Sequence, residues 1–523
     1  MHGRCLSYSP RPPARPSALR SVRGLALAGL IAGSTLPGAT ANLEAQVSSS
    51  DYTEPHQRRA LDIYRTLIAF RSAAGHGQVP AVAEYLARQF RDAGWPAEDV
   101  HVLPLVLPDG EETASLVVRY RGDGSSGEDP VLMIAHMDVV DALPEDWERD
   151  PFTLVEEEGY FFGRGTLDDK FGVTTLTSTF LRLREEGFVP TRDLILAFTG
   201  DEETGMLTTR ALVEEHRALT DAAFALNADG GGGVLNEAGE PVQFDVQTAE
   251  KTYATFELTV TNPGGHSSMP RADNAIYQLA EALRRIEAHR FPVRSNETTR
   301  LYFQNAARAG EGEVARAMAR FAENPDDREA AEVLRGVPDL VGLTRTTCVA
   351  TMLRAGHAEN ALPQSATATV NCRIFPGVEV AEVERTLRRV ALGREGADAA
   401  SGETKGAAGP AGPDDAHFRI EVLDDPVASP ASPIREDVME AVRVGVERIH
   451  PGTPITPYMA PYGTDGKEIR RGGIPTYGVM GLFVKGSDIF AHGLNERVTV
   501  KAFYDALEYW YAVMTHLAGR PTS

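Results

Sequence analysis

The chain has 523 residues, of which 42% are hydrophobic and 24% charged, a composition typical of a soluble globular protein and unlike that of a disordered one. This length is too great for one ordinary hydrophobic core, so we expect at least two domains. The formal net charge of −22 makes the surface repel phosphate backbones, which argues against a nucleic-acid partner.

The first 41 residues have the pattern of a secretory signal peptide. Arginines precede the first acidic residue, Glu44, an apolar run follows at 25–31, and Ala39-Thr40-Ala41 fits a small-residue cleavage site. The run is too short to cross a membrane comfortably. We therefore expect export, giving a secreted or periplasmic protein with no stable membrane span. A disordered basic tail or an organelle transit peptide is the alternative.

Three cysteines occur, Cys5, Cys348 and Cys372. Cys5 would be removed with the signal peptide. The other two could form one disulfide, or they could be buried thiols on neighbouring strands. Three cysteines are too few for a disulfide framework or for a cysteine-based zinc site.

Strand-like and helical patterns alternate along most of the remaining chain. Helical periodicity begins near Arg58 and returns at 80–93, 173–186, 208–217 and 436–449. Short apolar runs that predict buried strands lie at 131–135, 194–199, 224–226 and 476–480. Apolar strands that alternate with helices predict an α/β fold with a mostly parallel sheet covered on both faces.

The middle of the chain has a different order, strand–helix–strand–helix–strand, at 255–261, 274–288, 366–374, 380–392 and 417–422. It predicts an α+β domain inserted into the first domain. The expected boundaries are 51–250 and 429–523 for the two parts of the first domain and 251–428 for the insertion. Residues 291–345 look helical, and 393–415 form an expected exposed loop.

Five motifs, most of them at strand ends, carry the candidate chemistry. They contain His136 with Asp138, Asp168, Glu202 with Glu203, Asp229, and His492. In open α/β sheets, binding sites gather beyond the carboxyl ends of the strands. Two histidines with several carboxylates suit zinc well, and cobalt or manganese tolerably.

These residue types fit a hydrolase that uses two metal ions. Two adjacent dications need a bridging carboxylate, and together they polarise a carbonyl and generate hydroxide near neutral pH. A further carboxylate must take the proton from the water and pass it to the leaving amine. Glu202 and Glu203 can divide these tasks, because neighbouring side chains in a loop can point to different sides. Each motif alone has a structural explanation, such as a helix N-cap at Asp168-Asp169, but five in order favour metal chemistry.

The ordered motifs resemble the di-zinc exopeptidase family of aminoacylase, carboxypeptidase S, glutamate carboxypeptidase, bacterial dipeptidases and succinyl-diaminopimelate desuccinylase. The similarity runs from about residue 60 to 515 and includes Trp147 with Pro151-Phe152, Gly264-Gly265-His266, Asn360 before Pro363, and Pro475. It implies a zinc-exopeptidase catalytic domain with an inserted α+β lid and dimerisation domain. It also implies two Zn²⁺ per chain, with Co²⁺ or Mn²⁺ as alternatives.

The resemblance assigns roles to the motif residues. It implies two ligand sets, the first of His136, Asp168 and Asp229 and the second of Asp168, Glu203 and His492. Asp168 would bridge the two ions, Glu202 would be the general base, and Asp138 would orient the imidazole of His136. The family commonly has a strained peptide bond after the bridging aspartate, here between Asp168 and Asp169.

In the lid, the resemblance implies that His266 reaches an active site, often that of a partner subunit, and helps to polarise the scissile carbonyl. Asn360 and Arg373 would hold the substrate, Arg373 by a forked contact with a free carboxylate. Alternatively, His266 is a loop histidine without a role and Arg373 pairs with a lid carboxylate. Gly463-Thr464-Asp465 corresponds to a family loop near the substrate. The lid would also form a homodimer.

Two local departures from the family pattern bear on substrate preference. Asn371 stands where an aspartate often precedes the lid arginine, and Gly481-Leu482-Phe483 replaces Phe-Gly-Pro. The expected function is a two-metal hydrolase that cleaves a peptide or amide bond in a small substrate and releases an amino acid, as a carboxypeptidase or dipeptidase does. The main alternative is an N-acyl amino acid hydrolase. A non-catalytic binding relative would not need Glu202, and a serine or cysteine hydrolase lacks its motif, since no Gly-x-Ser-x-Gly sequence occurs.

Overall fold

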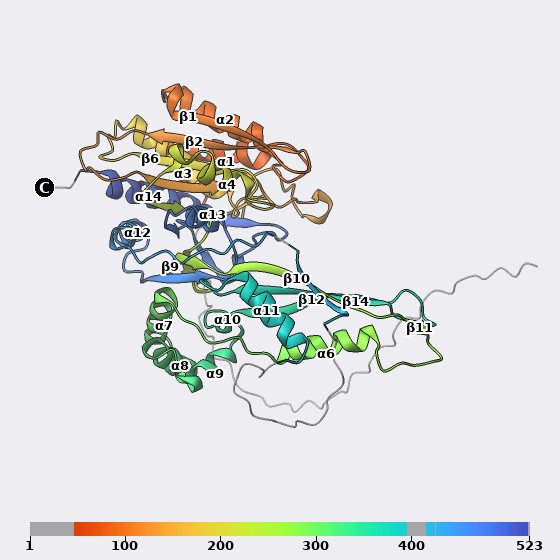
Figure 1. Cartoon of the computed structure of the whole chain (residues 1–523). Helices are drawn as coiled ribbons and strands as arrows, with labels where there is room; N and C mark the ends of the chain where they lie inside the picture. Colours follow the sequence, from red (N-terminus) through yellow and green to blue (C-terminus); the bar gives the residue numbers. More distant parts are fainter. Residues whose placement is uncertain (1–46, 395–414, 424, 521–523) are drawn as a thin grey trace, which may run out of the picture. The chain divides into compact units, whose positions relative to one another are not determined.

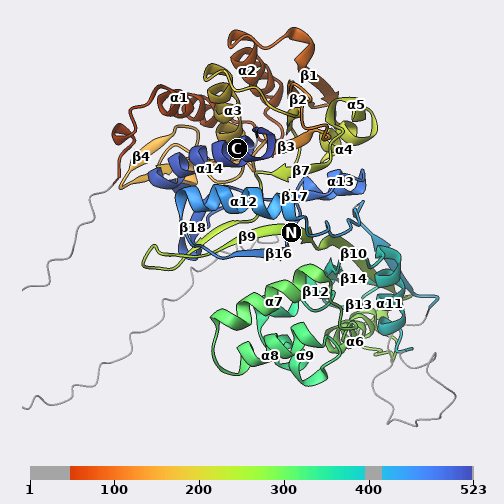
Figure 2. The same cartoon turned by 90° about the vertical axis from the view of Figure 1, so that its left-hand side faces the viewer.

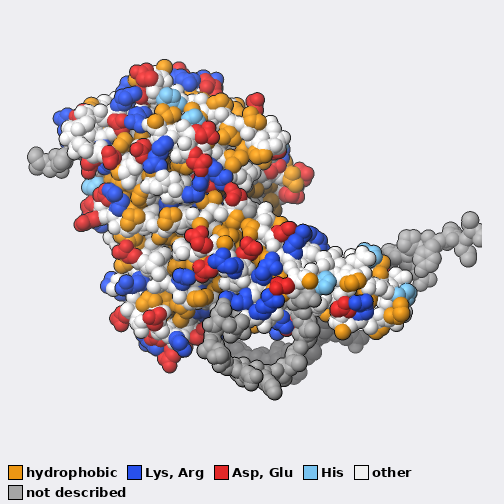
Figure 3. All heavy atoms as spheres, in the orientation of Figure 1, with side chains coloured by type: hydrophobic (Ala, Val, Ile, Leu, Met, Phe, Trp, Pro, Cys, Tyr) orange, Lys and Arg blue, Asp and Glu red, His pale blue; other side chains and the backbone are white. Residues whose placement is uncertain are grey.

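The computed structural model describes residues 47–394, 415–423 and 425–520. The predicted signal peptide at 1–41 and most of the predicted loop at 393–415 lie outside the described residues. Within them, no helix is both long enough and apolar enough to cross a membrane. On the face shown in Figure 3, acidic and basic side chains are interspersed.

The larger of the sheets is mixed and has ten strands (Figure 1). Its order is β1-β2-β6-β3-β7-β17-β9-β8-β18, and β16 pairs with β9 beside this path. The central neighbours β6, β3, β7 and β17 are parallel, whereas β1, β2 and β6 pair antiparallel. The strands are β1 (Val100–Val106), β2 (Glu112–Tyr120), β3 (Val131–His136), β6 (Leu194–Thr199), β7 (Phe224–Asn227), β8 (Gly232–Leu235), β9 (Pro241–Glu250), β16 (Ile455–Ala460), β17 (Thr476–Gly478) and β18 (Phe483–Lys485). The predicted parallel sheet is confirmed at its centre, and its antiparallel edge strands were not predicted.

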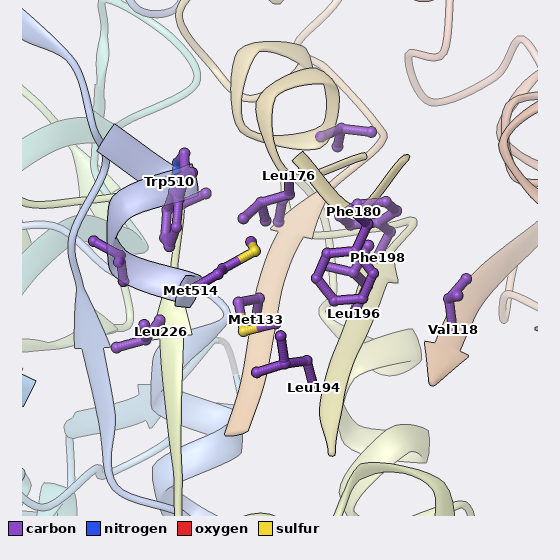
Figure 4. Close-up of a cluster of buried hydrophobic side chains, with 14 of the residues drawn as sticks. Val118, Met133, Leu176, Phe180, Leu194, Leu196, Phe198, Leu226, Trp510 and Met514 are labelled. Carbon is purple, nitrogen blue, oxygen red and sulfur yellow. The ribbon is translucent and has the colours of Figure 1, made fainter. Parts of the chain in front are cut away.

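Helices cover both faces of this sheet because successive residues of a central strand point to opposite sides. Met133 lies in one core cluster and Ile134 in another, on opposite faces of β3. Figure 4 shows the first cluster, where Leu176 and Met514 pack from two helices onto Met133. The helices of this part are α1 (Pro55–Ala69), α2 (Val79–Asp92), α3 (Lys170–Glu185), α4 (Leu207–Glu214), α5 (Arg217–Thr220), α12 (Glu436–Ile449), α13 (Gly466–Arg471) and α14 (Val500–Ala518). A small three-stranded sheet joins β4 (Val155–Glu157), β5 (Tyr160–Phe162) and β19 (Arg497–Thr499).

A second, antiparallel sheet contains the middle of the chain and has its own hydrophobic core. Its order is β12-β14-β10-β15, and β11 pairs with β13 in a separate short ribbon. The strands are β10 (Thr252–Thr261), β12 (Thr347–Ala355), β14 (Ser365–Ile374), β15 (Phe418–Val422), β11 (Gly265–His266) and β13 (Ala361–Leu362). Helices α6 (Ala275–Ala288) and α11 (Val380–Ala391) contact each other and this sheet. The predicted strand–helix alternation is present, with β12 as an additional edge strand.

Residues 291–345 are helical, as predicted, and they contact the large sheet. They form α7 (Glu297–Ala309), α8 (Gly312–Glu323), α9 (Arg328–Arg335) and α10 (Pro338–Val341). Helix α7 packs against β16 (Figure 2), where Asn305 Nδ2 donates to Thr456 Oγ1 at 3.4 Å. The buried hydroxyls of Thr248 and Thr298 lie 2.7 Å apart. This helical segment therefore connects the second sheet to the edge of the first.

The chain crosses between the two sheets twice, and both crossings contact one buried arginine. Glu250, the last residue of β9, pairs with Arg470 Nη2. Arg470 Nε donates to Ser429 Oγ at 2.9 Å, and Ser429 lies on the return segment between β15 and α12. Arg470 is 3% exposed and Glu250 2%. Because a buried charge is costly unless it is paired, this ion pair fixes the position of both crossings.

Cys348 and Cys372 form a disulfide at directly opposed positions of β12 and β14. This settles the alternative that the sequence left open. The bond closes a sequence separation of 24 residues, for which the chain-entropy model gives a stabilisation of about 3.5 kcal/mol. The disulfide also supports β12 at the edge of its sheet, where β14 is its one neighbouring strand among the described residues.

Reduction of this disulfide should therefore lower the melting temperature of the folded protein by several degrees. Calorimetry with and without a strong reductant measures the shift, and the double variant Cys348→Ser/Cys372→Ser provides the control. The variant should melt at the lower temperature under both conditions. A wild-type melting temperature that does not change with the reductant would show that the disulfide contributes nothing to stability.

Candidate active site

The predicted ligands converge at one edge of the large sheet. His136 is the last residue of β3, Glu202 and Glu203 follow β6, and Asp229 follows β7. These three strands are parallel neighbours, so their carboxyl ends meet. Asp168 lies in the loop before α3, and His492 lies in the segment between β18 and β19.

Two groups of possible metal ligands share Asp168. The ligand atoms of His136, Asp168 and Asp229 lie within 4.8 Å of one another, and so do those of Asp168, Glu203 and His492. His136 Nε2 is 2.9 Å from Asp168 Oδ1, and His492 Nε2 is 3.2 Å from Asp168 Oδ2. These are the two ligand sets that the family resemblance implies. A third group, which overlaps the others, joins Glu202 to His136 and Glu203.

The electrostatics of the cluster indicate a site for cations. Burial raises the pKa of Glu202 and of Asp229 well above the ordinary range, and neighbouring carboxylates raise both further. Hydrogen bonds with Asp168 and Glu203 raise the pKa of His492 to about 10. Four half-buried carboxylates thus face two imidazoles, of which that of His136 is buried and that of His492 is exposed. Oxygen and imidazole donors with excess negative charge fit divalent metal ions.

Asp138 contacts both the imidazole of His136 and the loop that follows β6. Its backbone carbonyl lies 3.0 Å from His136 Nδ1, and its carboxylate lies 3.5 Å from the same nitrogen. The carboxylate also accepts hydrogen bonds from the backbone N–H groups of Glu202 and Glu203, at 3.2 and 3.0 Å. One side chain therefore fixes the ring of a ligand and the backbone that carries Glu202 and Glu203.

Glu496 holds the loop that carries Asp168. Its carboxylate accepts hydrogen bonds from the backbone N–H groups of Gly165 at 3.1 Å, Leu167 at 2.7 Å and Asp168 at 3.0 Å. It also pairs with Arg164 at 2.5 Å and is fully buried. The peptide bond between Asp168 and Asp169 is cis, at the position where the resemblance implied a strained bond. Glu496 lies in the His492 motif, but the sequence alone assigned it no role.

The loop at Gly463-Thr464-Asp465 is connected to the same centre. The carboxylate of Asp465 accepts hydrogen bonds from the hydroxyls of Thr199 and Thr209. Thr199 is the last residue of β6, three positions before Glu202. Thr464 N donates to Glu250 Oε2 at 2.7 Å, which joins this loop to the buried Arg470 pair.

Two cavities of opposite character adjoin the ligand cluster. One, of about 390 Å³, has a largely apolar wall beyond the ligands, formed by Leu167, Met480, Leu482, Val484, Ile489 and Ala491. The other, of about 580 Å³, is lined beyond the ligands by Lys251, Tyr253, Arg373 and Lys467, and also by Arg210, which pairs with the two lining carboxylates Asp425 and Glu468. Glu202, Glu203, Gly463 and His492 line both. The ligand cluster therefore separates an apolar space from one in which basic side chains outnumber the carboxylates beyond the ligands, and we call these the apolar cavity and the cationic cavity.

The sequence profile of Peptidase family M20/M25/M40 matches residues 132–516. The chain belongs to this family. It is 29% identical over 391 residues to the N-fatty-acyl-amino acid synthase/hydrolase PM20D1 of Xenopus tropicalis, covering 73% of this chain and 71% of the relative. It is 27% identical over 408 residues to a probable carboxypeptidase S-like 2 of Dictyostelium discoideum, covering 76% and 73%. The fold is similar to that of an M20 family metallo-carboxypeptidase from Sulfolobus solfataricus, with a TM-score of 0.62, 17% identity and coverage of 88% and 99%.

As a member of the M20 family, the chain is a metal-dependent hydrolase. The resemblance inferred from the ordered motifs is thus confirmed, and so is the combination of an α/β catalytic part with an α+β insertion. Both the peptidase and the N-acyl amino acid hydrolase interpretations fit the known relatives.

Two predicted residues of this M20 chain lie apart from the ligand cluster. His266 is on the β11–β13 ribbon, where its Nδ1 lies 3.1 Å from Ser268 N, and Asn360 O accepts a hydrogen bond from Ser267 N at the same distance. Within the described part of the chain, neither lines the apolar or the cationic cavity. The ribbon extends from the second sheet (Figure 1). The roles of His266 and Asn360 stay predictions.

Arg373, by contrast, lies in the cationic cavity together with a residue that sequence reasoning missed. Arg373 Nη1 donates to Pro461 O at 3.1 Å, and its guanidinium lies 4.7 Å from the ring centre of Tyr253. Lys251 Nζ donates to Arg345 O at 2.9 Å. Among the described residues, neither cation pairs with a carboxylate. The alternative that Arg373 is neutralised by a lid carboxylate is therefore not supported. Both cations line the cavity without a paired carboxylate, and Lys251, which is 2% exposed, also donates to Thr347 Oγ1 at 3.4 Å.

Proposed function

We propose that the chain hydrolyses the amide bond of an N-acyl amino acid with an apolar acyl group. The observation that carries the proposal is the pair of cavities on the two sides of the ligand cluster. An N-acyl amino acid has one carboxylate on the amine side of its amide and a hydrocarbon on the carbonyl side. The carboxylate would contact Arg373 and Lys251, the acyl chain would occupy the apolar cavity, and the amide would lie at the ligands.

The similarity to an N-fatty-acyl-amino acid synthase/hydrolase supports this substrate class. A carboxypeptidase or dipeptidase substrate is the second candidate, because its terminal carboxylate would fit the same cations, and the similarity to a probable carboxypeptidase S-like protein supports it. The apolar wall favours the acyl substrate, since a peptide would bring polar backbone groups into that cavity without hydrogen-bond partners.

In the proposed mechanism, His136, Asp168 and Asp229 would hold one ion, and Asp168, Glu203 and His492 would hold the other. When bound, two Zn²⁺ ions, or Co²⁺ or Mn²⁺, polarise a carbonyl and make a water acidic. Glu202 takes a proton from the attacking water, whose oxygen bonds to the carbonyl carbon. The C–N bond then breaks, and Glu202 returns the proton to the departing nitrogen. The products are a carboxylate and a free amino acid.

The test is hydrolysis of matched N-acyl amino acids and dipeptides by chelator-treated protein, with and without added zinc, cobalt or manganese. Metal-dependent release of amino acid from the acyl substrates, at a higher kcat/KM than from the dipeptides, is the expected result. A preference for dipeptides would favour the second candidate. No turnover of either class with any metal would refute both proposals.

Replacing Arg373 or Lys251 by Met should raise KM for substrates with a free carboxylate by about 10–100-fold, because each charge-assisted contact contributes about 1.5–3 kcal/mol. The value of kcat should change much less, since neither residue contacts the reacting atoms in the proposed mechanism. Steady-state kinetics on an N-acyl amino acid and on its C-terminal amide provides the comparison. The amide should bind equally well to both variants and to the parent, and a carboxylate substrate with unchanged KM would contradict the assignment.

The pH dependence of KM should show that Lys251 binds the substrate carboxylate. Burial, and secondarily the nearby charge of Arg373, lower the pKa of Lys251 to about 7. A lysine is cationic below its pKa, so KM for a carboxylate substrate should increase as the pH rises above 7. The increase should be absent in Lys251→Met. A parent profile that is flat between pH 6 and 9 would contradict this role.

We also propose that the lid forms a homodimer through β12. This strand is at the edge of its sheet and exposes Val349, Met352 and Leu353 by 59–66%. An exposed apolar edge strand is a natural pairing surface. A partner's lid would allow His266 to reach a second ligand cluster, as the family resemblance implies.

Leu353→Asp should therefore give a monomer with much reduced activity, measured by light scattering and kinetics. Val189→Asp, at another exposed apolar position, should change neither the oligomeric state nor the activity. A wild-type protein that is monomeric would contradict the proposal.

Export through a signal peptide at residues 1–41 remains a proposal, and so do the domain boundaries at 250/251 and 428/429. The disulfide supports export, because such bonds persist in oxidising compartments. N-terminal sequencing of protein recovered outside the cytoplasm tests it, and the expected first residue is Asn42. Recovery of the intact N-terminus inside the cell would contradict it.

A further inference from the structure

We propose that the apolar cavity selects an unbranched acyl chain of about ten carbons and that Leu482 sets the length limit. This inference rests on the proposed function and specifies its substrate. It depends on the orientation of the substrate, on the volume available to the acyl chain and on the closed end of the apolar cavity.

The direction follows from the two cavities. The carboxylate of an N-acyl amino acid and its side chain are both attached to the carbon next to the amide nitrogen. If the carboxylate contacts Arg373 and Lys251, the amino-acid half lies in the cationic cavity. The carbonyl half must then leave the ligands on the other side, because the two cavities meet at Glu202, Glu203 and His492. The acyl chain is the only part of the substrate that can fill the apolar cavity.

The volume of the apolar cavity limits the length of the acyl chain. A water molecule takes up about 30 Å³ in the liquid, and a methylene is of similar size, so 390 Å³ holds at most about thirteen such groups. Some of that space lies against the ligands and takes the carbonyl group itself. A chain of about ten carbons therefore fills the apolar part. A compact or charged acyl group would leave the wall without contacts or would bury a charge against it.

The two ends of the apolar cavity differ in their exposure to solvent. Met480 and Leu482 are 8% and 2% exposed and belong to a core cluster with Phe503 and Leu507. Because this core is closely packed, the cavity ends at these side chains. Ile489 is 60% exposed and marks the solvent side. The backbone at Leu482 is also fixed, since Leu482 O accepts a hydrogen bond from Gly233 N at 2.8 Å. Leu482 belongs to the Gly481-Leu482-Phe483 segment that departs from the family pattern.

The experiment measures kcat/KM for a series of N-acyl derivatives of one amino acid with straight chains of 2–18 carbons. Each buried methylene contributes about 0.8 kcal/mol, so kcat/KM should increase by up to about fourfold per carbon, reach a maximum near ten carbons and then stop increasing. Leu482→Ala removes three carbons from the closed end and should move the maximum to chains longer by two or three carbons. Leu482→Phe should move it to shorter chains. Leu143→Ala, at an exposed leucine that lines neither cavity, is the matched control and should leave the maximum in place.

The outcomes separate this inference from the function on which it rests. Hydrolysis that is independent of chain length, or a maximum that Leu482→Ala does not move, would overturn the inference and leave the hydrolase function intact. A kcat/KM that increases with the hydrophobicity of the amino-acid side chain instead would reverse the proposed direction. No hydrolysis at any chain length would refute the proposed function itself. Circular dichroism and melting temperature of each variant exclude a folding defect as the cause.

Discussion

Glu202→Gln should lower kcat by about 10²–10⁴-fold while the protein keeps its metal ions. The substitution preserves the shape of the side chain and removes its ability to accept a proton. Glu202 lines both cavities, and its backbone is held by Asp138, so the neutral amide should occupy the same position. Parallel measurement of kcat and of metal content by mass spectrometry separates a lost base from a lost ligand.

Two controls sharpen this prediction. Glu203→Gln, at the adjacent position, should lose metal together with activity, because Glu203 lies in a ligand group with Asp168 and His492. Glu215→Gln, on an exposed glutamate after α4, should behave as the parent. A Glu202→Gln protein with near-parental kcat would show that another group moves the proton, and a loss of metal would move Glu202 into the ligand set.

Asp168→Asn should abolish binding of the metal pair. Asp168 belongs to both principal ligand groups, and its two carboxylate oxygens lie near different histidines, His136 and His492. An amide cannot bridge two cations with negative charge. Loss of a residue that merely orients a ligand costs about 10–100-fold in metal affinity, so loss of the bridge should cost more than about 100-fold.

Isothermal titration of the metal-free protein with zinc measures this loss independently of turnover. The parent should bind two ions, and the Asp168→Asn variant should bind at most one, weakly. Asp141→Asn is a suitable control, because this carboxylate is half-exposed and pairs with Arg71 away from the cluster. Two tight sites in the Asp168 variant would show that the ions do not share this residue.

The sequence predicted the centre of the fold well because the central strands are uniformly apolar. β6 and α12 have the predicted bounds, and β3 and β7 differ from theirs by one residue. His136, Glu202, Glu203 and Asp229 were singled out for the same reason, since each ends or follows a predicted strand. Asp168 and His492 lie in loops, and their motifs drew attention to them instead. The antiparallel β1 and β2 were missed because their periodicity is mixed: β1 is only partly buried along its length.

The contacts that support the site could not be predicted from local patterns. Glu496 contacts the Asp168 loop across more than 300 residues, and Lys251 meets Arg345 across 94. Such pairs depend on how the sheets pack, which no short motif encodes. One signal was present for Glu496, an acidic residue in an otherwise predicted ligand motif. For Lys251 there was none, because its position at a sheet crossing becomes visible only in the fold.

The shared contact of Arg470 with Glu250 and Ser429 bears on how the second sheet is inserted into the chain. One guanidinium spans only a few ångströms. The residues at which the chain leaves the first sheet and returns to it therefore lie next to each other. A short turn could therefore close the first sheet without the insertion. The strand order that brings the ligands together contains no strand of the second sheet.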